Sequence, residues 1–488
     1  MASTTSPIAA IVGAAQIVQR PAPGDDLRGA RGPIELMVAA ARDAATDAGA
    51  PSLLARVQWI GVAGGFFRYK NPGALVAREI GADARCALSA ISGSAPQEML
   101  AMAAARIASG EISAALILGG EARWTAGRLK RAQLNPAWIT DLGDGDVESV
   151  STYPDEMGAE ARIFNGTPPA YALMEDALRH SLGRTVSEHR DHIAELWERF
   201  SAVAVDNPWA WDRVAHSATE IREPSPTNRM IAFPYTKAMV ANNTVDMASA
   251  LLLCSTELAA QFGVDRDALV FPNVVTKSHE TWQVASRQHL DRLPAVKAAG
   301  DRAMTLAGIS IEDLTHIDLY ACFPSIVQMT ARELGIDITR QLTITGGLGF
   351  AAAAIGNAVG HSMAAMVPLV RNGGIGFIHG NGGLANTHTF GIYSASPPEQ
   401  FTFENAQHLV STERCEALPD DYAGRVDIDA ATVVYDREGP THAIVGVGID
   451  HRRRWIVSTE TELMDAVCDE GIAGAQGHLT SEGKLVLP

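Results

Sequence analysis

The hydrophobic positions of the chain switch between a period of about 3.6 residues and short continuous apolar runs, which predicts alternating helices and buried strands. In the first part of the chain, strands are expected over residues 8–12, 57–62 and 114–118, and helices over residues 32–48 and 93–105. Such alternation favours an α/β fold.

The stretch from Gly346 to Phe390 shows the same order of elements at higher density. A helix after Gly356-Asn357 is predicted from a helical run of apolar residues and is ended by Asn372-Gly373. A buried strand is expected over residues 374–379, and a glycine-rich turn follows it at 380–383. Because ligands in open α/β sheets bind outside the carboxyl ends of strands, His379 is expected to expose its ring at a site.

Two parts of the chain match each other in spacing and sequence. Gly49 is followed after ten residues by Ile60 and then by AREIG at 77–81, and Gly308 is followed after ten residues by Leu319 and then by ARELG at 331–335. Gly93-Ser94 and Gly356-Asn357 each precede a helix and a strand. This internal duplication predicts two similar halves packed about a pseudo-twofold axis.

Two further regions lie outside the duplication. Residues 126–240, with helices expected over 170–182 and 188–203, are predicted to be an inserted lid or loop region. After Pro397-Pro398, short strands are expected over 425–435, 443–447, 455–458 and 484–487, with one helix over 463–468. This pattern predicts a separate small β-domain, interpreted as a closed barrel of the oligonucleotide-binding (OB) type.

Composition and charge limit the classes of function. The 488 residues are 47% hydrophobic and 19% charged, which suits two or three globular domains. There is no apolar run of eighteen residues and no basic segment before the first apolar one, so neither a membrane span nor a signal peptide is predicted, and a cytoplasmic location is expected. The net charge of −17 disfavours nucleic acid as a partner, but it does not exclude a local basic pocket for a phosphorylated ligand.

Metal and disulfide chemistry is not indicated. The five cysteines show neither CxxC nor mixed Cys/His spacing, which argues against zinc and against a disulfide framework. The acidic cluster Asp141, Asp144, Asp146 and Glu148 lacks the spacing of a calcium-binding loop, and a solvated loop is expected instead. No GxGxxG follows the first strand, so a dinucleotide site is not predicted.

Several motifs in a fixed order resemble the thiolase superfamily, and particularly thiolase-like proteins related to the sterol-carrier thiolases that carry an additional C-terminal domain. They are GSAPQ, IASGE, LGGEA, NNTVDMASA, YACF, GG...GN (from Gly346-Gly347 to Gly356-Asn357) and HGNGG, and the similarity covers about residues 5–396. The resemblance implies a duplicated βαβαβ fold in α/β/α/β/α layers. It divides the chain into a first half (1–125 and 241–265), an inserted loop domain (126–240), a second half (266–396) and an additional domain (397–488). Members of the superfamily bind acyl-CoA and make or break carbon–carbon or thioester bonds through cysteine and histidine.

All four catalytic positions implied by the resemblance differ in this chain. The nucleophilic cysteine corresponds to Gly93, with Ser92 and Ser94 as the nearest nucleophilic side chains. The basic histidine of the family's GHP motif corresponds to Asn357, and the second cysteine to His379. The residue that holds the oxyanion-hole water corresponds to Tyr320, at the start of YACF. A serine without a neighbouring base is a poor substitute for a thiolate, because its hydroxyl stays protonated near pH 7.

The positions implied to contact CoA are less altered. Asn242 lies at the place of a pantetheine-contacting serine, Asn243 follows it, and Lys237 is a candidate phosphate contact, with a solvated lysine as the alternative. The backbone of Gly380 and Gly382 is expected to approach the thioester closely.

Simple structural roles remain open for other residues. Ser94 is expected to cap the helix that follows it, Cys322 to be a small buried hydrophobe, and His361 to be structural, whereas Tyr320 is either a core residue or a pocket residue.

Two classes of function follow from the resemblance. The first is a CoA or acyl-CoA binder that lacks thiolase chemistry, with CoA as a ligand and with neither a tightly bound cofactor nor a metal. The second is an acyl-CoA enzyme of altered mechanism in lipid or sterol metabolism: a retro-aldol lyase using Tyr320 and His379, or an acyltransferase or hydrolase. A homo-oligomer through the thiolase halves is possible, and the C-terminal domain would replace the separate OB-type partner of related aldolases.

Overall fold

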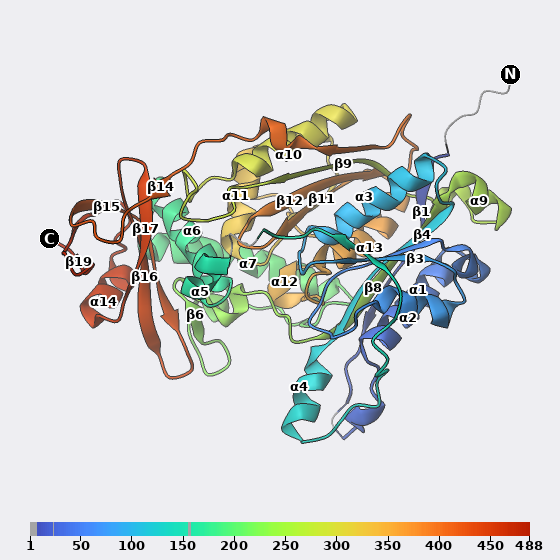
Figure 1. Ribbon diagram of the computed structural model, residues 1–488, viewed down its shortest axis with the longest axis horizontal. Coiled ribbons are helices and arrows are strands. Elements are labelled where there is room, and N and C mark those ends of the chain that lie inside the picture. Colours follow the sequence, from blue (N-terminus) through green and yellow to red (C-terminus); the bar gives the residue numbers. More distant parts are fainter. Residues whose placement is uncertain (1–6, 23, 155–157) are drawn as a thin grey trace.

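The structure is a computed structural model that describes residues 7–22, 24–154 and 158–488. Two mixed sheets form its centre (Figure 1). The strands of the first sheet lie in the order β1 (Ala9–Val18), β8 (Asp246–Ser255), β4 (Ala114–Ala122), β2 (Trp59–Val62), β3 (Arg85–Ser89) and β5 (Val147–Val150). Those of the second lie in the order β10 (His316–Asp318), β11 (Ile375–Gly382), β12 (Thr387–Ser394), β9 (Phe271–His279) and β13 (Thr402–Asn405).

The predicted duplication is confirmed by the strand order and strand directions. In the first sheet β2 runs parallel to β4, which is antiparallel to β8, which is antiparallel to β1. The strands β10, β11, β12 and β9 repeat this arrangement in the second sheet. The sheets are joined where the backbones of Ile11 and Val270 exchange hydrogen bonds of 2.8 and 3.1 Å.

Helices cover both sheets and fill the space between them. Between the sheets lie α3 (Ala95–Ala108) and α13 (Ala358–Arg371), whose apolar residues share one buried cluster with strands of both sheets. Outside the first sheet lie α1 (Pro33–Asp47) and α2 (Pro72–Ile80), and outside the second lie α10 (Pro294–Ala307) and α11 (Pro324–Leu334) (Figure 1). These are the α/β/α/β/α layers that the resemblance implies. Two short helices, α9 (Thr256–Gln261) and α12 (Gly347–Phe350), lie in connections.

The repeated sequences AREIG and ARELG end equivalent helices in the same way. Gly81 follows α2 with a φ of 72°, and Gly335 follows α11 with a φ of 68°. A residue with a Cβ is disfavoured in this left-handed conformation, so glycine ends each helix and turns the chain into the next segment.

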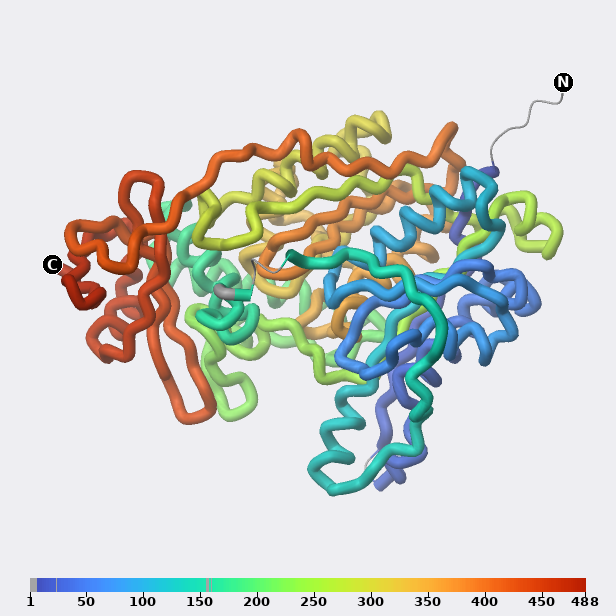
Figure 2. The backbone as a smooth tube through the Cα atoms, in the orientation of Figure 1, coloured from blue at the N-terminus to red at the C-terminus, as the bar shows by residue number. Residues whose placement is uncertain are grey.

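The insertion contributes helices and also strands of neighbouring sheets. Its helices are α4 (Arg123–Arg131), α5 (Gly158–Phe164), α6 (Pro168–Ser181), α7 (Val186–Asp206) and α8 (Ala218–Arg222). β5 lies at the edge of the first sheet, whereas β6 (Met230–Ala232) and β7 (Tyr235–Thr236) join the sheet of the C-terminal region. Figure 2 shows α4 and its neighbouring loops projecting from the body as an arm.

The C-terminal region forms a third sheet rather than a separate closed barrel. Its strands lie in the order β14 (Glu416–Ala417), β17 (Arg452–Ser458), β16 (Pro440–Ile449), β15 (Gly424–Tyr435), β18 (Gln476–Leu479) and β19 (Leu485–Val486), with α14 (Thr461–Asp469) packed on it. This order is open, so the OB-type barrel is not confirmed. The pairing of Val434 with Ala232 of β6 ties the sheet to the insertion, and β13 extends the second half past the boundary predicted at 396. Among the described residues, no helix has the length and apolar character needed to cross a membrane.

Candidate functional site

A cavity of about 180 Å³ lies where the two halves meet the insertion. Gly93, just before α3, comes from the first half, and Tyr320 and Asn381 come from the second. Thr167 and Tyr171, at the start of α6, form the wall contributed by the insertion. The remainder of the lining is mainly apolar and small, from Ile91, Ala241, Leu348, Ala353, Ala354, Ile355 and Ala358, with Asn243, Cys322, Phe323 and three glycines, Gly356, Gly382 and Gly383.

Gly93 and Tyr320 fit together in the cavity wall. A Cβ placed on Gly93 would lie 2.3 Å from the Tyr320 hydroxyl oxygen and 2.3 Å from the backbone oxygen of Asn381. Both distances are far below van der Waals contact, so the phenol of Tyr320 occupies the space into which a side chain at position 93 would project.

The Tyr320 phenol is a neutral polar group on this wall. Burial raises its pKa well above the usual value of 10, and the nearby Cys322 and Tyr153 raise it further. No hydrogen-bond partner of the hydroxyl is found in the described part of the chain. At neutral pH this group is therefore a protonated phenol that can donate to a ligand oxygen.

Next to Tyr320, the cavity wall is formed by Asn381 and Tyr171, which are linked by a hydrogen bond. Asn381 Nδ2 donates to the Tyr171 hydroxyl at 2.8 Å and points toward Cys322 Sγ at 3.8 Å. The Tyr171 hydroxyl also accepts from the Ala385 amide and donates to the Gly383 carbonyl. Burial raises the pKa of Cys322 to about 12, so its thiol stays protonated and is a poor nucleophile. Cys322 is the small buried residue that the sequence predicts, and it also lines the cavity.

The structure corrects the expectation that His379 exposes its ring. β11 continues to Gly382, so His379 lies inside the strand and only 1% of it is exposed. Its ring stacks on Phe390 at 4.7 Å, and its Nε2 lies 3.1 Å from His388 Nδ1. Burial lowers the pKa of His379 to about 3. The residue that reaches the cavity is Asn381, two positions further along the same face of the strand, and sequence reasoning missed it.

Asn357 is also turned away from the cavity. Its Nδ2 donates to the Gly119 carbonyl at 3.0 Å and to Ser249 Oγ at 2.9 Å, which fixes it against β4 and β8. A Cβ on Gly119 would lie 2.2 Å from Asn357 Cγ, so glycine is required for this packing. Asn357 therefore does not supply a base beside Gly93.

Ser94 and His361 have structural partners. Ser94 Oγ lies 2.9 Å from both Ser92 Oγ and Thr387 Oγ1 and makes no side-chain cap bond to α3, so the predicted cap is wrong. His361 Nδ1 lies 2.9 Å from Gln16 Oε1 in a buried site that lowers its pKa to about 4, which agrees with a structural role.

The residues expected to contact CoA are only partly brought together. Asn243 and Gly382 line the cavity. Asn242 lies beside them, but its Oδ1 accepts the Thr244 amide at 3.0 Å in a turn. A Cβ on Gly380 would lie 2.4 Å from Thr389 Oγ1, so that glycine serves packing inside the sheet. Lys237 is exposed and does not line the cavity.

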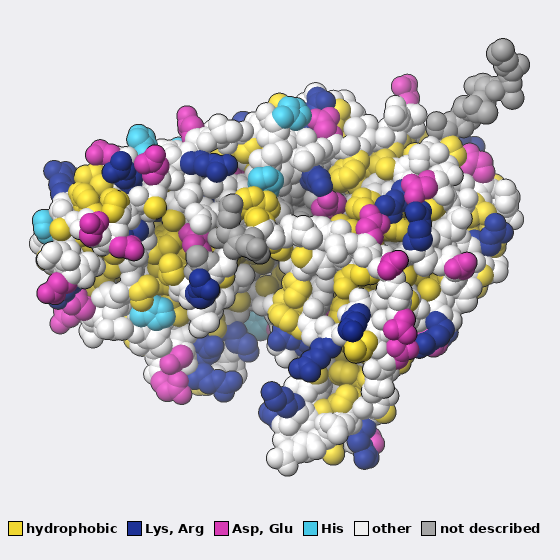
Figure 3. Space-filling model, viewed as in Figure 1, with side chains coloured by type: hydrophobic (Ala, Val, Ile, Leu, Met, Phe, Trp, Pro, Cys, Tyr) yellow, Lys and Arg dark blue, Asp and Glu magenta, His cyan; other side chains and the backbone are white. Residues whose placement is uncertain are grey.

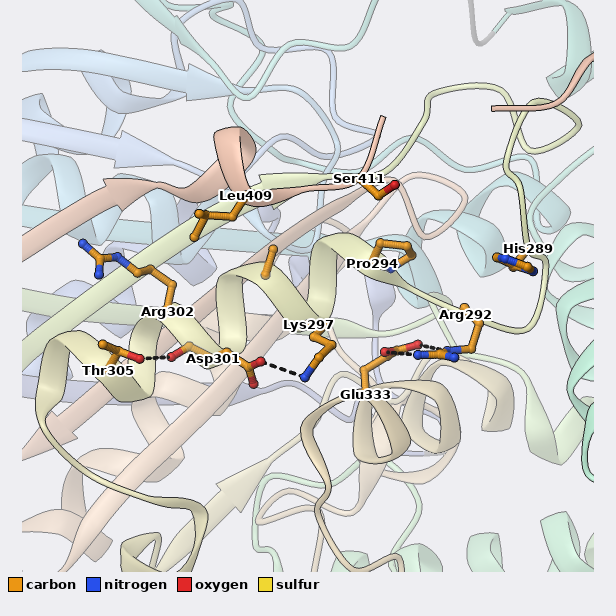
Figure 4. Close-up of a pocket in the computed structure, with 11 residues that line it drawn as sticks. His289, Arg292, Pro294, Lys297, Asp301, Arg302, Thr305, Glu333, Leu409 and Ser411 are labelled. Carbon is orange, nitrogen blue, oxygen red and sulfur yellow. Dashed lines mark hydrogen bonds and ion pairs between the residues drawn. The ribbon is translucent and has the colours of Figure 1, made fainter. Parts of the chain in front are cut away.

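A larger groove of about 610 Å³ runs along α10 (Figure 4). Its charged side chains are already paired: Arg292 with Glu333 at 2.5 Å, Lys297 with Asp301 at 2.8 Å, and Arg302 with Glu404 at 2.8 Å. These internal ion pairs leave less charge for a ligand, so the smaller cavity at Gly93 is the better candidate site.

Two residues of the acidic cluster at residues 141–148 form ion pairs with arginines. Asp141 pairs with Arg78 at 3.0 Å, and Glu148 lies on β5 and pairs with Arg106 at 2.9 Å. In residues 7–22, 24–154 and 158–488, no group of three or more His, Cys, Asp or Glu side chains is arranged to hold a metal ion.

Comparisons with known proteins point to one superfamily. No family model matches the chain. A stretch of 198 residues, 40% of this chain, is 25% identical to an acetyl-CoA acetyltransferase of Methanocaldococcus jannaschii. This match spans 47% of that relative, so only about half of its length is represented.

Solved structures extend the comparison to the whole chain. A monomeric SCP2-thiolase-like protein type 1 from Mycobacterium smegmatis aligns over 99% of both chains, with 28% identity and a TM-score of 0.83. An acetyl-CoA acetyltransferase from Syntrophomonas wolfei aligns over 80% of this chain and all of its own (TM-score 0.57, 15% identity). An Ltp2-ChsH2(DUF35) aldolase aligns over 80% of this chain and 98% of its own (TM-score 0.59, 16% identity). The last two show the fold alone. The motifs, the duplicated halves and the full-length structural match together place the chain in the thiolase superfamily, as a thiolase-like protein with an additional C-terminal domain.

Proposed function

We propose that the protein binds a CoA thioester in the cavity at Gly93 and does not catalyse thiolysis or Claisen condensation. The observation that carries this proposal is the fit between Gly93 and Tyr320. Thiolase chemistry needs a thiolate that attacks the thioester carbon, and here the corresponding space is filled by a phenol. The thiol that lines the cavity, Cys322, stays protonated because of burial.

The surroundings of Gly93 support binding of a thioester carbonyl. Gly93 directly precedes Ser94 and α3, a helix of 14 residues, whose N-terminal end carries a partial positive charge. The Tyr320 hydroxyl adds a neutral donor on the same wall. The ligand class is supported by the partial match to an acetyl-CoA acetyltransferase, and the proposal requires no tightly bound cofactor.

The proposal is tested with purified protein in two assays. Titration calorimetry with CoA and acetyl-CoA is expected to show binding, and thiolysis of acetoacetyl-CoA is expected to be absent. Turnover on the order of 1 per second or faster would contradict the loss of thiolase chemistry. Absence of any binding by the wild type would contradict the ligand assignment.

A second function, retro-aldol cleavage of a β-hydroxyacyl-CoA, is favoured by the Tyr320 hydroxyl, which has no hydrogen-bond partner among the residues that the structure describes. In this reaction the β-hydroxyl loses its proton, the bond between Cα and Cβ breaks to release a carbonyl compound, and the acyl-CoA enolate is protonated at Cα. No cysteine nucleophile is needed. A neutral phenol can stabilise the enolate by donating to its oxygen, but the buried His379 does not serve as the base.

Tyr320→Phe distinguishes the two functions, because it keeps the ring beside Gly93 and removes only the hydroxyl. If the protein is a lyase, β-hydroxyacyl-CoA cleavage by the wild type should fall by about 10²-fold or more in the variant, while CoA binding is retained. If the wild type cleaves none of a panel of β-hydroxyacyl-CoA thioesters with different acyl chains, the lyase is excluded and binding of a CoA thioester remains the proposed function.

A further inference from the structure

The arm formed around α4 is locally basic although the chain as a whole is strongly acidic. α4 carries Arg123, Arg128, Lys130 and Arg131. In the described part of the chain, none of these four forms an ion pair with a carboxylate. Figure 3 shows Lys and Arg side chains gathered with hydrophobic ones on this arm, beside the hollow in the middle of the face. Unpaired positive charge on a protein of net charge −17 marks a surface suited to an anion.

Three arginines of this region lie over aromatic rings. Arg123 lies 4.2 Å above the ring of Phe66, and Arg128 lies 4.1 Å above that of Trp124. The two tryptophans Trp124 and Trp211 meet edge to face at 6.2 Å. The ring of Trp211 is covered in turn by Arg20 at 5.5 Å. We call these six residues the arginine–aromatic platform.

Two chain segments place the platform on the rim of the cavity. The Arg123 amide donates to the Val245 carbonyl at 3.0 Å, and Asn243, two residues earlier, lines the cavity. On the other side, Gly356 lines the cavity and packs so closely on Gly64 that a Cβ would lie 2.1 Å from its carbonyl oxygen. Phe66 follows two residues after Gly64. Two residues span at most about 7 Å, so Phe66 lies close to the edge of the cavity at Gly356. A ligand that extends out of the cavity past Gly356 therefore meets the platform.

We infer that the platform binds the phosphorylated nucleotide end of the ligand whose thioester lies at Gly93. This inference rests on the proposed function. Planar guanidinium groups match phosphate oxygens in two-pronged hydrogen bonds, and aromatic faces stack on nucleobases. Phe66 is 52% exposed, so one of the three rings is open to contact.

Arg20 donates to the Ala210 carbonyl but forms no ion pair among the described residues, so the charges around it fit a bound anion. The pKa of Arg20 is lowered, first by burial and then by the like charge of Arg213, while Asp212 acts in the opposite direction. Asp212 is already engaged with His216 at 2.9 Å. Glu121, whose carboxyl interacts electrostatically with Arg123, is buried and accepts the Phe66 amide. A bound phosphate would relieve the repulsion between the two arginines.

Titration calorimetry with three probes tests the inference: CoA, 3′,5′-ADP as its nucleotide end, and acetyl-S-pantetheine as its thioester end. Arg123→Gln and Arg128→Gln are each expected to weaken CoA and 3′,5′-ADP about tenfold, the size of one lost charged contact. Both variants should bind acetyl-S-pantetheine as the wild type does, which also shows that they are folded. Lys297→Gln, which removes an exposed cation on α10, is the matched control and should change none of the three affinities.

The outcomes separate the platform from the proposed function. Wild-type affinity of both arginine variants for 3′,5′-ADP would overturn the inference about the platform. A loss of CoA affinity in Lys237→Ala alone would overturn it too, since that places the nucleotide at Lys237 instead of the platform. Equally tight binding of tripolyphosphate would overturn a nucleotide site in favour of a general polyanion surface. If the wild type binds 3′,5′-ADP but not acetyl-S-pantetheine, the proposed function fails and the platform stands. If the wild type binds acetyl-S-pantetheine but not 3′,5′-ADP, the inference about the platform is contradicted and the proposed function is retained.

Discussion

At the residue scale, the candidate site is defined by which side chains reach the cavity and which are held elsewhere. Gly93 and Tyr320 share one volume, so neither can be changed without regard to the other. Inserting atoms at position 93 would force either the phenol or the backbone of Asn381 to move, which typically costs about 1–3 kcal/mol. The chemistry of the cavity is thus limited by packing as well as by the absence of a thiolate.

Outside the cavity, the buried carboxyl of Glu280 makes the stability of the protein depend on pH. Burial raises its pKa from 4.5 to about 7, although the nearby Arg287 acts in the opposite direction. Since the folded pKa lies above the unfolded one, the stability that this group contributes is fully present below pH 4.5 and is lost as the pH rises through 7. Glu280→Gln is expected to keep the acceptor for the Ala295 amide while removing the ionisation.

The measurement is the melting temperature of wild type and Glu280→Gln between pH 4.5 and 8. The stability of the variant relative to the wild type should increase with pH, by on the order of 3 kcal/mol in total, because one pKa unit corresponds to about 1.4 kcal/mol. Glu312→Gln, at an exposed position, serves as the control and should show no such trend. A difference between Glu280→Gln and wild type that stays constant across the range would contradict the assignment.

Individual site residues are only partly predictable from the sequence. The motif order identifies the segments that surround the cavity, and Gly93, Tyr320, Asn243 and Gly382 do line it. His379 and Asn381 lie on the same face of β11, so the face does not distinguish them, and only the end of the strand shows which one reaches the cavity. Asn357 is held by Gly119 and Ser249, from strands far away in the sequence, and no local pattern reveals such partners.

At the element scale, the wall of the cavity is supported by the C-terminal sheet. Thr167 directly precedes α6, and Tyr171 lies in its first turn. Further along the helix, Asp176 accepts the Ala431 amide of β15 at 2.8 Å. On α5, Glu160 accepts Trp455 Nε1 from β17 at 2.8 Å. The sheet therefore fixes the position of two insertion helices, one of which lines the site.

Trp455→Phe is expected to destabilise the protein by about 1–3 kcal/mol, because it removes a donor from the buried Glu160 carboxyl while keeping an aromatic ring against Phe164. CoA binding should weaken as well if α5 and α6 shift. Thermal unfolding and calorimetry with CoA measure the two effects. Val457→Ala, on the same strand but 54% exposed, is the matched control and should leave both nearly unchanged. Equal behaviour of the two variants would show that the contact does not support the wall.

Element positions are predicted well where the apolar period is strong and less well where pairing is long-range. The helix predicted over 32–48 is α1, and those predicted over 170–182 and 188–203 are α6 and α7. β1 and β4 extend several residues beyond the predicted strands, because their polar or glycine-rich ends are stabilised by pairing with β8. β5 and β6 were not predicted, since each is short and joins a sheet formed by distant segments.

At the scale of the whole molecule, the two duplicated halves are predictable from the repeated spacing in the sequence. The C-terminal region is different, because its sequence predicts a separate domain whereas its contacts join it to the rest of the protein. Its composition changes after Pro397-Pro398, which predicts a separate domain. Yet Ala430 and Ile444 lie in one apolar cluster with the insertion and the second half. A cytoplasmic location and assembly through the thiolase halves stay predictions.

The last prediction concerns the removal of this region. Arg453 is buried, pairs with Asp429 at 2.6 Å and donates to the backbone oxygens of Ala285 and Arg287 in the second half, so truncation leaves these groups and the apolar cluster exposed. A chain that ends at Ser411 keeps β13 in its sheet but should lose cooperative folding, and the fragment 412–488 should not fold alone. The intact protein should instead unfold in a single calorimetric transition. Circular dichroism and calorimetry on the full chain and both fragments measure this. Two folded fragments whose transitions add up to that of the full chain would show that the C-terminal sheet is an independent domain, as its composition suggests.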